Sequence, residues 1–171
     1  MPRFPFRGGL VTVLTVSVVA LLAIPSPAAA DPVDIEGLNQ PISLTVLPSG
    51  RVYIAEKPGV IKTATSIESS SAQQVLDISD VVGSGFDHGL TSVAYSDGWL
   101  YATYSLDGGN NDDCADFTTG CPMAGRVSRF PVHADGSLGP EDIVIDGAIA
   151  PRRLCVQATT HGIDNVEIAP D

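Results

Sequence analysis

Residues 42–55 read ISLTVLPSGRVYIA. Apolar and β-branched residues flank a Pro-Ser-Gly corner, so this stretch predicts two short antiparallel strands, 42–47 and 51–55. Pro58-Gly59 then turns the chain again, and residues 60–62 predict a third short strand. No run of apolar residues at helical spacing stands out after residue 30, so the sequence predicts an all-β fold.

The same pattern returns at residues 89–104, GLTSVAYSDGWLYATY, with a corner at 96–98 and a third strand predicted over 126–130. Gly98 follows Gly50 by 48 residues. A third copy opens at Ile163 and reaches its corner at Pro170-Asp171. A period of 40–50 residues with three or four strands is typical of a β-propeller blade. We therefore expect an incomplete propeller of about two and a half blades, the front part of a longer protein, and a β-sandwich is the alternative.

The first thirty residues have the features of a secretory signal-peptide helix. Arg3 and Arg7 precede an apolar run over 10–24, prolines break that run, and residues 28–30 are alanines suited to cleavage. The apolar run is shorter than the ~20 residues that cross a bilayer, which makes a membrane anchor the weaker alternative. We expect a signal peptide at 1–30, a propeller domain over 31–171, a secreted extracellular protein and no membrane span in the mature chain.

The charge balance excludes one class of partner. Without residues 1–30 the chain keeps all 20 Asp and Glu but only seven of its nine Lys and Arg. Binding to nucleic acid needs clustered Lys and Arg against the phosphates, and the only adjacent basic pair is Arg152-Arg153. Neutral ligands such as sugars, or cations, fit this chain better.

Two polar stretches leave alternatives open. Cys114 and Cys121 bracket a short loop that a disulfide could close in an oxidising compartment, and Cys155 then has no partner in this sequence. Residues 107–113 offer hard oxygen ligands that calcium prefers, although they lack the full spacing of an EF-hand loop. A solvated acidic loop is the other interpretation.

Two histidines stand where repeats begin. Asp87-His88-Gly89 opens the second repeat, and His161-Gly162 opens the third. In a propeller, a loop that leads into the innermost strand lies near the central axis, so both imidazoles could face one shared site. Composition alone favours turn or surface positions for both.

Several short segments, in this order and spacing, resemble secreted sugar dehydrogenases of the glucose/sorbosone type, which use pyrroloquinoline quinone (PQQ). The matching segments are residues 38–41, 47–56, 89–90, 100–105 and 125–130, and His161 followed by residues 168–171. The resemblance covers most of residues 37–171.

The resemblance implies a six-bladed propeller with PQQ and a bound calcium ion near the axis, most of their ligands lying beyond residue 171. It also implies that a small-molecule sugar is oxidised by hydride transfer from its anomeric carbon to the quinone, with His161 as the base. Two positions depart from the family pattern: Asp164 replaces a small glycine, and Asp87 replaces a glutamine, so the glutamine's role is not carried over. The competing hypothesis is a non-catalytic extracellular propeller that binds carbohydrate or protein. The sequence leaves the oligomeric state open.

Overall fold

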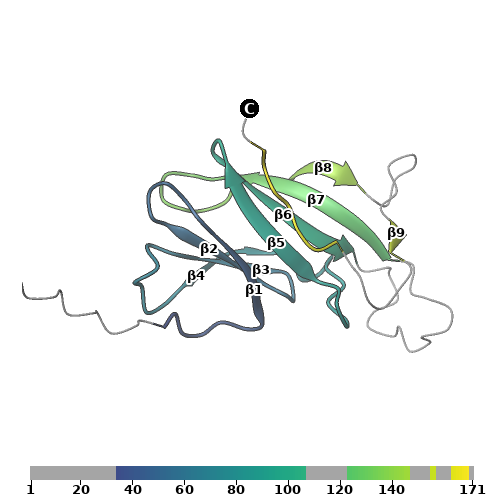
Figure 1. Ribbon diagram of the computed structural model, residues 1–171, viewed down its shortest axis with the longest axis horizontal. Coiled ribbons are helices and arrows are strands. Elements are labelled where there is room, and N and C mark those ends of the chain that lie inside the picture. Colours follow the sequence, from purple (N-terminus) through teal and green to yellow (C-terminus); the bar gives the residue numbers. More distant parts are fainter. Residues whose placement is uncertain (1–33, 107–122, 147–154, 157–162, 170–171) are drawn as a thin grey trace, which may run out of the picture. The chain divides into compact units, whose positions relative to one another are not determined.

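A computed structural model describes residues 34–106, 123–146, 155–156 and 163–169. The chain divides into two compact units, residues 1–31 and 32–171, and all described residues belong to the second. Within the described residues every regular element is a β-strand (Figure 1). The all-β prediction is therefore confirmed, whereas the predicted signal-peptide helix lies outside the described residues.

The first sheet is an antiparallel meander of four strands. It runs in the order β1 (Pro41–Val46), β2 (Val52–Glu56), β3 (Val60–Ala64) and β4 (Gln73–Asp77). The predicted corner between the first two strands closes with a hydrogen bond from the Gly50 amide to the Leu47 carbonyl oxygen, 2.8 Å long. Gly50 has φ +88°, a conformation that glycine adopts without steric cost.

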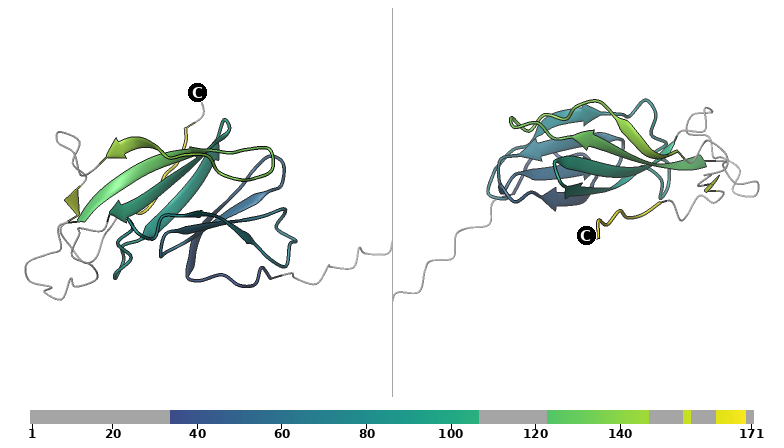
Figure 2. Two further views of the ribbon diagram at one scale, coloured as in Figure 1. Left: turned by 180° about the vertical axis from the view of Figure 1, so that it is seen from behind. Right: turned by 90° about the horizontal axis from the view of Figure 1, so that it is seen from above.

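The second sheet repeats this meander. It contains β5 (Leu90–Ser96), β6 (Trp99–Leu106), β7 (Met123–Pro131) and β8 (Asp142–Asp146), and the two-residue β9 (Cys155–Val156) pairs with the start of β7 (Figure 2). Asp97 and Gly98 both have positive φ and connect β5 to β6 as a two-residue hairpin turn, which matches the right-handed twist of the strands.

Two details differ from the sequence-based prediction. Each sheet has a fourth strand, β4 or β8, where three were predicted. Residues 163–169, predicted to be a strand, form none, because their backbone groups pair with no ladder partner within the described residues. The predicted corner at residues 170–171 lies outside the described part of the chain.

Strand β2 is buried on both faces because each face packs against a different layer. Side chains alternate along a strand, so Tyr53 and Ala55 join the core shared with β5 and β6, whereas Val52 and Ile54 form a second cluster with Ala64. The shared core also contains Ile61, Leu90, Val93, Leu100, Ala102, Tyr104 and Phe130. The two sheets therefore pack against each other through this shared cluster.

Strand β1 exposes one apolar face. Ile42, Leu44 and Val46 point to the same side and are about half exposed or more, with Leu44 at 62%. Nothing in the described part of the chain covers this row. The alternating pattern of β1 therefore predicts a strand correctly, but it does not predict that the apolar face is the exposed one.

Candidate functional site

The first strand of each sheet is hydrogen-bonded to its neighbour in the next repeat. The Val93 amide of β5 donates to the Ser43 hydroxyl of β1 over 3.2 Å. In the same way, the Val166 amide donates to the Ser92 hydroxyl of β5 over 3.3 Å. Ser43 and Ser92 occupy equivalent positions, each just after a register shift at the start of its strand. We call this repeated hydrogen bond the serine contact.

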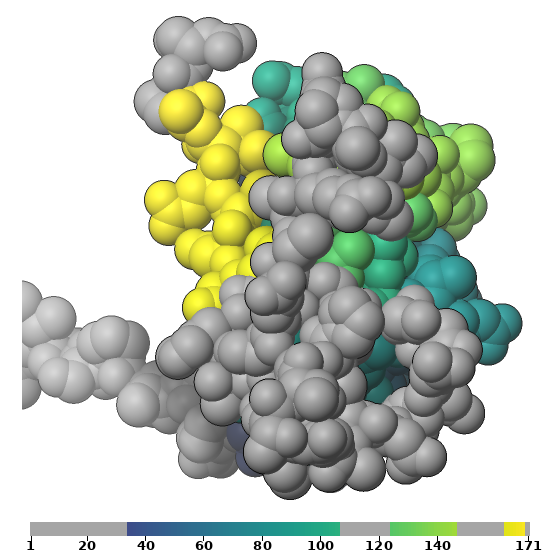
Figure 3. Space-filling model, turned by 90° about the vertical axis from the view of Figure 1, so that its right-hand side faces the viewer, coloured from purple at the N-terminus to yellow at the C-terminus, as the bar shows by residue number. Residues whose placement is uncertain are grey.

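Residues 163–169 therefore lie beside β5 as β5 lies beside β1. The Ser92 hydroxyl also donates to the Asn165 side-chain oxygen over 2.8 Å, and the Thr91 hydroxyl donates to the Ile163 carbonyl oxygen. Figure 3 shows the segment, in yellow, at the surface, and most of its residues are exposed. The segment thus contacts β5 as β5 contacts β1, although it forms no strand.

The two histidines predicted to share a site stand at the same sequence spacing from the two serine contacts. His88 precedes Val93 by five residues, and His161 precedes Val166 by five. His161 itself, the predicted base, lies outside the described residues.

His88 is buried, which corrects the expectation of a surface position. Its side chain is 1% exposed, and its Nδ1 lies 3.3 Å from the Ser105 hydroxyl. The next residue, Gly89, has φ +148°, and a Cβ there would lie 2.6 Å from the Lys57 carbonyl oxygen. Only glycine permits this close approach. Sequence reasoning missed the burial because Ser105 comes 17 residues later in the chain.

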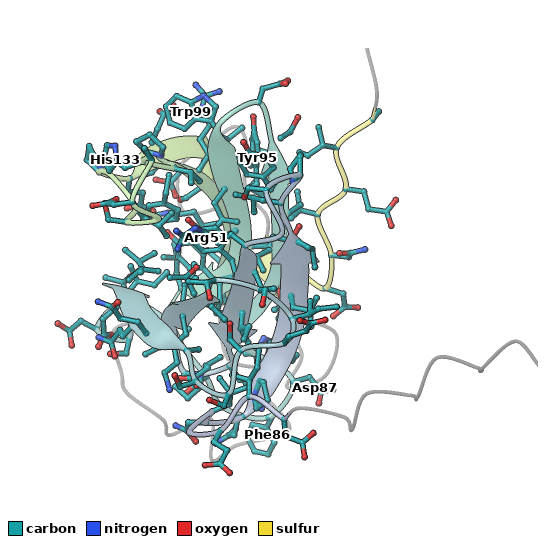
Figure 4. All side chains as sticks on the ribbon, turned by 90° about the vertical axis from the view of Figure 1, so that its left-hand side faces the viewer. Arg51, Phe86, Asp87, Tyr95, Trp99 and His133 are labelled. Carbon is teal, nitrogen blue, oxygen red and sulfur yellow. The ribbon has the colours of Figure 1, made fainter. Side chains whose placement is uncertain are left out.

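The residues just before His88 have the opposite exposure. Phe86 is 47% exposed, Asp87 is also exposed, and the Lys57 ammonium donates to the Phe86 carbonyl oxygen. Figure 4 shows Phe86 and Asp87 at the end of the sheets opposite Tyr95, Trp99 and His133. An aromatic ring and a carboxylate are therefore presented to solvent beside a buried imidazole.

A buried ion pair fixes the corresponding loop before β1. Glu56, 2% exposed, lies 2.8 Å from the Lys62 ammonium and accepts the Asn39 amide over 2.6 Å. Lys62 also donates to the Gly37 carbonyl oxygen over 2.6 Å. Both charges have partners, as buried charges require. Sequence reasoning did not find this cluster, because its residues come from three separate segments.

A second polar cluster lies within the second sheet. The hydroxyl groups of Tyr104 and Ser128, both fully buried, donate to the Glu141 carboxylate, from Ser128 over 2.5 Å. Beside them Arg126 pairs with Asp146 at 3.2 Å. Burial, and then the hydrogen bond to Glu141, raise the pKa of Tyr104 to about 12. This tyrosine is therefore a hydrogen-bond donor at neutral pH and not a base.

Raising the pH from about 10 to about 12 is expected to destabilise the protein through Tyr104. Tyrosine in the unfolded chain titrates near pH 10, so the folded state keeps a proton that the unfolded state releases. The stabilisation is complete below about pH 10 and is lost as the pH rises through about 12, by about 2–3 kcal/mol in the free energy of unfolding. Urea unfolding at about pH 9 and about pH 11.5 measures the loss. Tyr104→Phe should show a smaller loss, and equal losses in both proteins would contradict the assignment.

The described residues contain no group of three or more His, Cys, Asp or Glu that could hold a metal ion. The proposed calcium loop at residues 107–113 and the Cys114–Cys121 loop lie outside them, and Cys155 is described only as part of β9. Nor does any helix in the described ranges have the length and hydropathy needed to cross a membrane.

Comparison with known proteins identifies the fold. No protein-family model and no curated protein sequence matches the chain. One similar solved structure is the PQQ-bound form of aldose sugar dehydrogenase from Streptomyces coelicolor, with 21% identity over 67% of this chain and a TM-score of 0.49. Another is an oxidoreductase (glucose dehydrogenase) from Thermus thermophilus, with 23% identity over 70% of this chain and a TM-score of 0.50. The second likeness shows a shared fold, and the chain covers 32% of each structure's length.

Proposed function

We propose that residues 31–171 form the N-terminal part of a secreted sugar dehydrogenase that oxidises an aldose, with His161 as the proton acceptor. Residues 1–30 would be its secretory signal peptide. The observation that supports this proposal is the repeated serine contact: the Val166 amide bonds to Ser92 as the Val93 amide bonds to Ser43. In the proposed full-length propeller, His161 would precede a third inner strand as His88 precedes β5. The shared fold with a glucose dehydrogenase and the resemblance of the short sequence segments support it.

The chemistry assigned to His161 is general base catalysis. Oxidising an aldose at the anomeric carbon removes a hydride from carbon and a proton from the hydroxyl group, and a carbonyl group forms. A neutral imidazole, with a pKa near 6.5, can accept that proton at neutral pH. PQQ, when bound, would supply the two-electron acceptor for the hydride.

The described strands do not by themselves form a site for PQQ, which carries three carboxylates. Lys62, Arg126 and Arg129 are each paired with an acidic side chain of the same sheet. These strand cations are already paired with carboxylates, so we assign most of the groups that hold the quinone and calcium to other parts of the full-length protein. No step in this proposal depends on a described residue contacting the quinone.

The proposal is tested with the full-length protein. PQQ and calcium are added, and dye reduction is followed with a panel of aldoses. Oxidation of at least one aldose that depends on added PQQ supports a dehydrogenase. Glycan or protein binding without dye reduction would instead support the non-catalytic binding module. Detection of the mature protein in the culture medium, with an N-terminus near Asp31, tests secretion.

A further inference from the structure

Phe86 has a backbone conformation that is unfavourable for an aromatic residue. Its φ is +52°, in the left-handed region, where a non-glycine residue with a bulky side chain is a steric outlier. Two contacts hold it there. The Lys57 ammonium donates to the Phe86 carbonyl oxygen, and the His88 amide donates to the Gly85 carbonyl oxygen over 3.0 Å.

The first repeat meets the same backbone requirement with glycine. Gly37 precedes Ser43 by six residues, as Phe86 precedes Ser92 by six, and Gly37 has φ +73°. A lysine ammonium binds the carbonyl oxygen at both positions, Lys62 at Gly37 and Lys57 at Phe86. The fold therefore requires only the positive φ here, and the aromatic side chain of Phe86 adds strain.

The side chain of Phe86 is open to solvent over nearly half of its surface. It is 47% exposed, whereas His88 and Leu90, two and four residues later, are 1% and 0% exposed. Strained residues that a fold does not require are concentrated at functional sites. A solvent-facing ring beside the proposed catalytic face is therefore a candidate ligand contact.

We propose that Phe86 is the platform on which the ring of the sugar substrate stacks. The face of an aromatic ring is electron-rich and attracts the slightly positive C–H groups on the flat side of a pyranose. The acidic chain disfavours an anionic ligand, so a neutral sugar fits this ring. This inference rests on the proposed function and names a specificity-determining residue for it.

The test compares Phe86→Gly, Phe86→Tyr and the control Ile67→Gly in the full-length protein. Ile67 is an apolar loop residue with 65% exposure. Phe86→Gly is expected to raise KM for the preferred aldose about tenfold with little change in kcat, because the stacked aromatic face is lost. Its unfolding temperature should be unchanged or higher because glycine relieves the strain. Phe86→Tyr and Ile67→Gly should keep the wild-type KM.

Saturation-transfer NMR with the same aldose, in the absence of added PQQ, gives a readout independent of turnover. Phe86→Gly should weaken the sugar signal, and Phe86→Tyr should keep it. Sugar binding and KM that are unchanged in Phe86→Gly would overturn this inference while leaving the dehydrogenase proposal intact. A wild-type protein that neither binds nor oxidises any aldose would overturn both.

Discussion

Replacing His161 by alanine in the full-length protein is expected to lower kcat for aldose oxidation by about 10²–10⁴-fold. The imidazole is assigned the proton of the anomeric hydroxyl group, and no other residue is given that role. Residues 163–169 are held against β5 by hydrogen bonds to Ser92. The variant should therefore keep its unfolding temperature and its affinity for the sugar. Steady-state kinetics and thermal unfolding measure the two effects separately.

His133 provides the matched control. It is an exposed histidine in a turn, and its backbone amide donates to the Ser137 carbonyl oxygen, a bond that alanine would keep. His133→Ala should leave kcat unchanged. Near-wild-type sugar oxidation by His161→Ala would refute the assignment, and so would an equal loss in both variants.

Lys62→Met is expected to reduce the free energy of unfolding by about 3–5 kcal/mol, because it leaves the buried Glu56 carboxylate without its counter-charge. It also removes the donor to the Gly37 carbonyl oxygen, which fixes the loop before β1. Urea unfolding followed by circular dichroism measures the loss.

Two further variants separate this effect from the simple loss of a lysine. The double variant Glu56→Leu/Lys62→Met replaces both charges by apolar groups and should recover most of the stability. Arg129→Met breaks a more exposed pair with Asp142, which solvent screens, and should cost much less than Lys62→Met. If Lys62→Met cost no more than Arg129→Met, the pair at Glu56 would have no special structural role.

The hairpins could be predicted from the sequence because their signals are local. Pro-Ser-Gly at residues 48–50 and Asp97-Gly98 form turns between apolar segments, and both turns are present where expected. The strands β4 and β8 were missed because their sequences, QQVLD and DIVID, are half polar and do not alternate regularly. Such strands form because the edges of β3 and β7 are available for pairing, and this depends on the folded arrangement and not on the local sequence.

The candidate site was predictable only in part. The histidines at the starts of the repeats were found from their position before glycine. The burial of His88 and the exposure of Phe86 depend on contacts with Ser105 and Lys57, each from a distant part of the chain. The strain at Phe86 has no sequence signal of its own, since it becomes visible only when φ is known.

The serine contact has a consequence for how this protein can diversify. The same hydrogen bond spans 50 residues between Ser43 and Val93, and 74 residues between Ser92 and Val166. Equivalent positions therefore keep the same contact although the connections between them differ in length. Insertions can accumulate in the outer connections, and new surface recognition can evolve there, without displacing this contact.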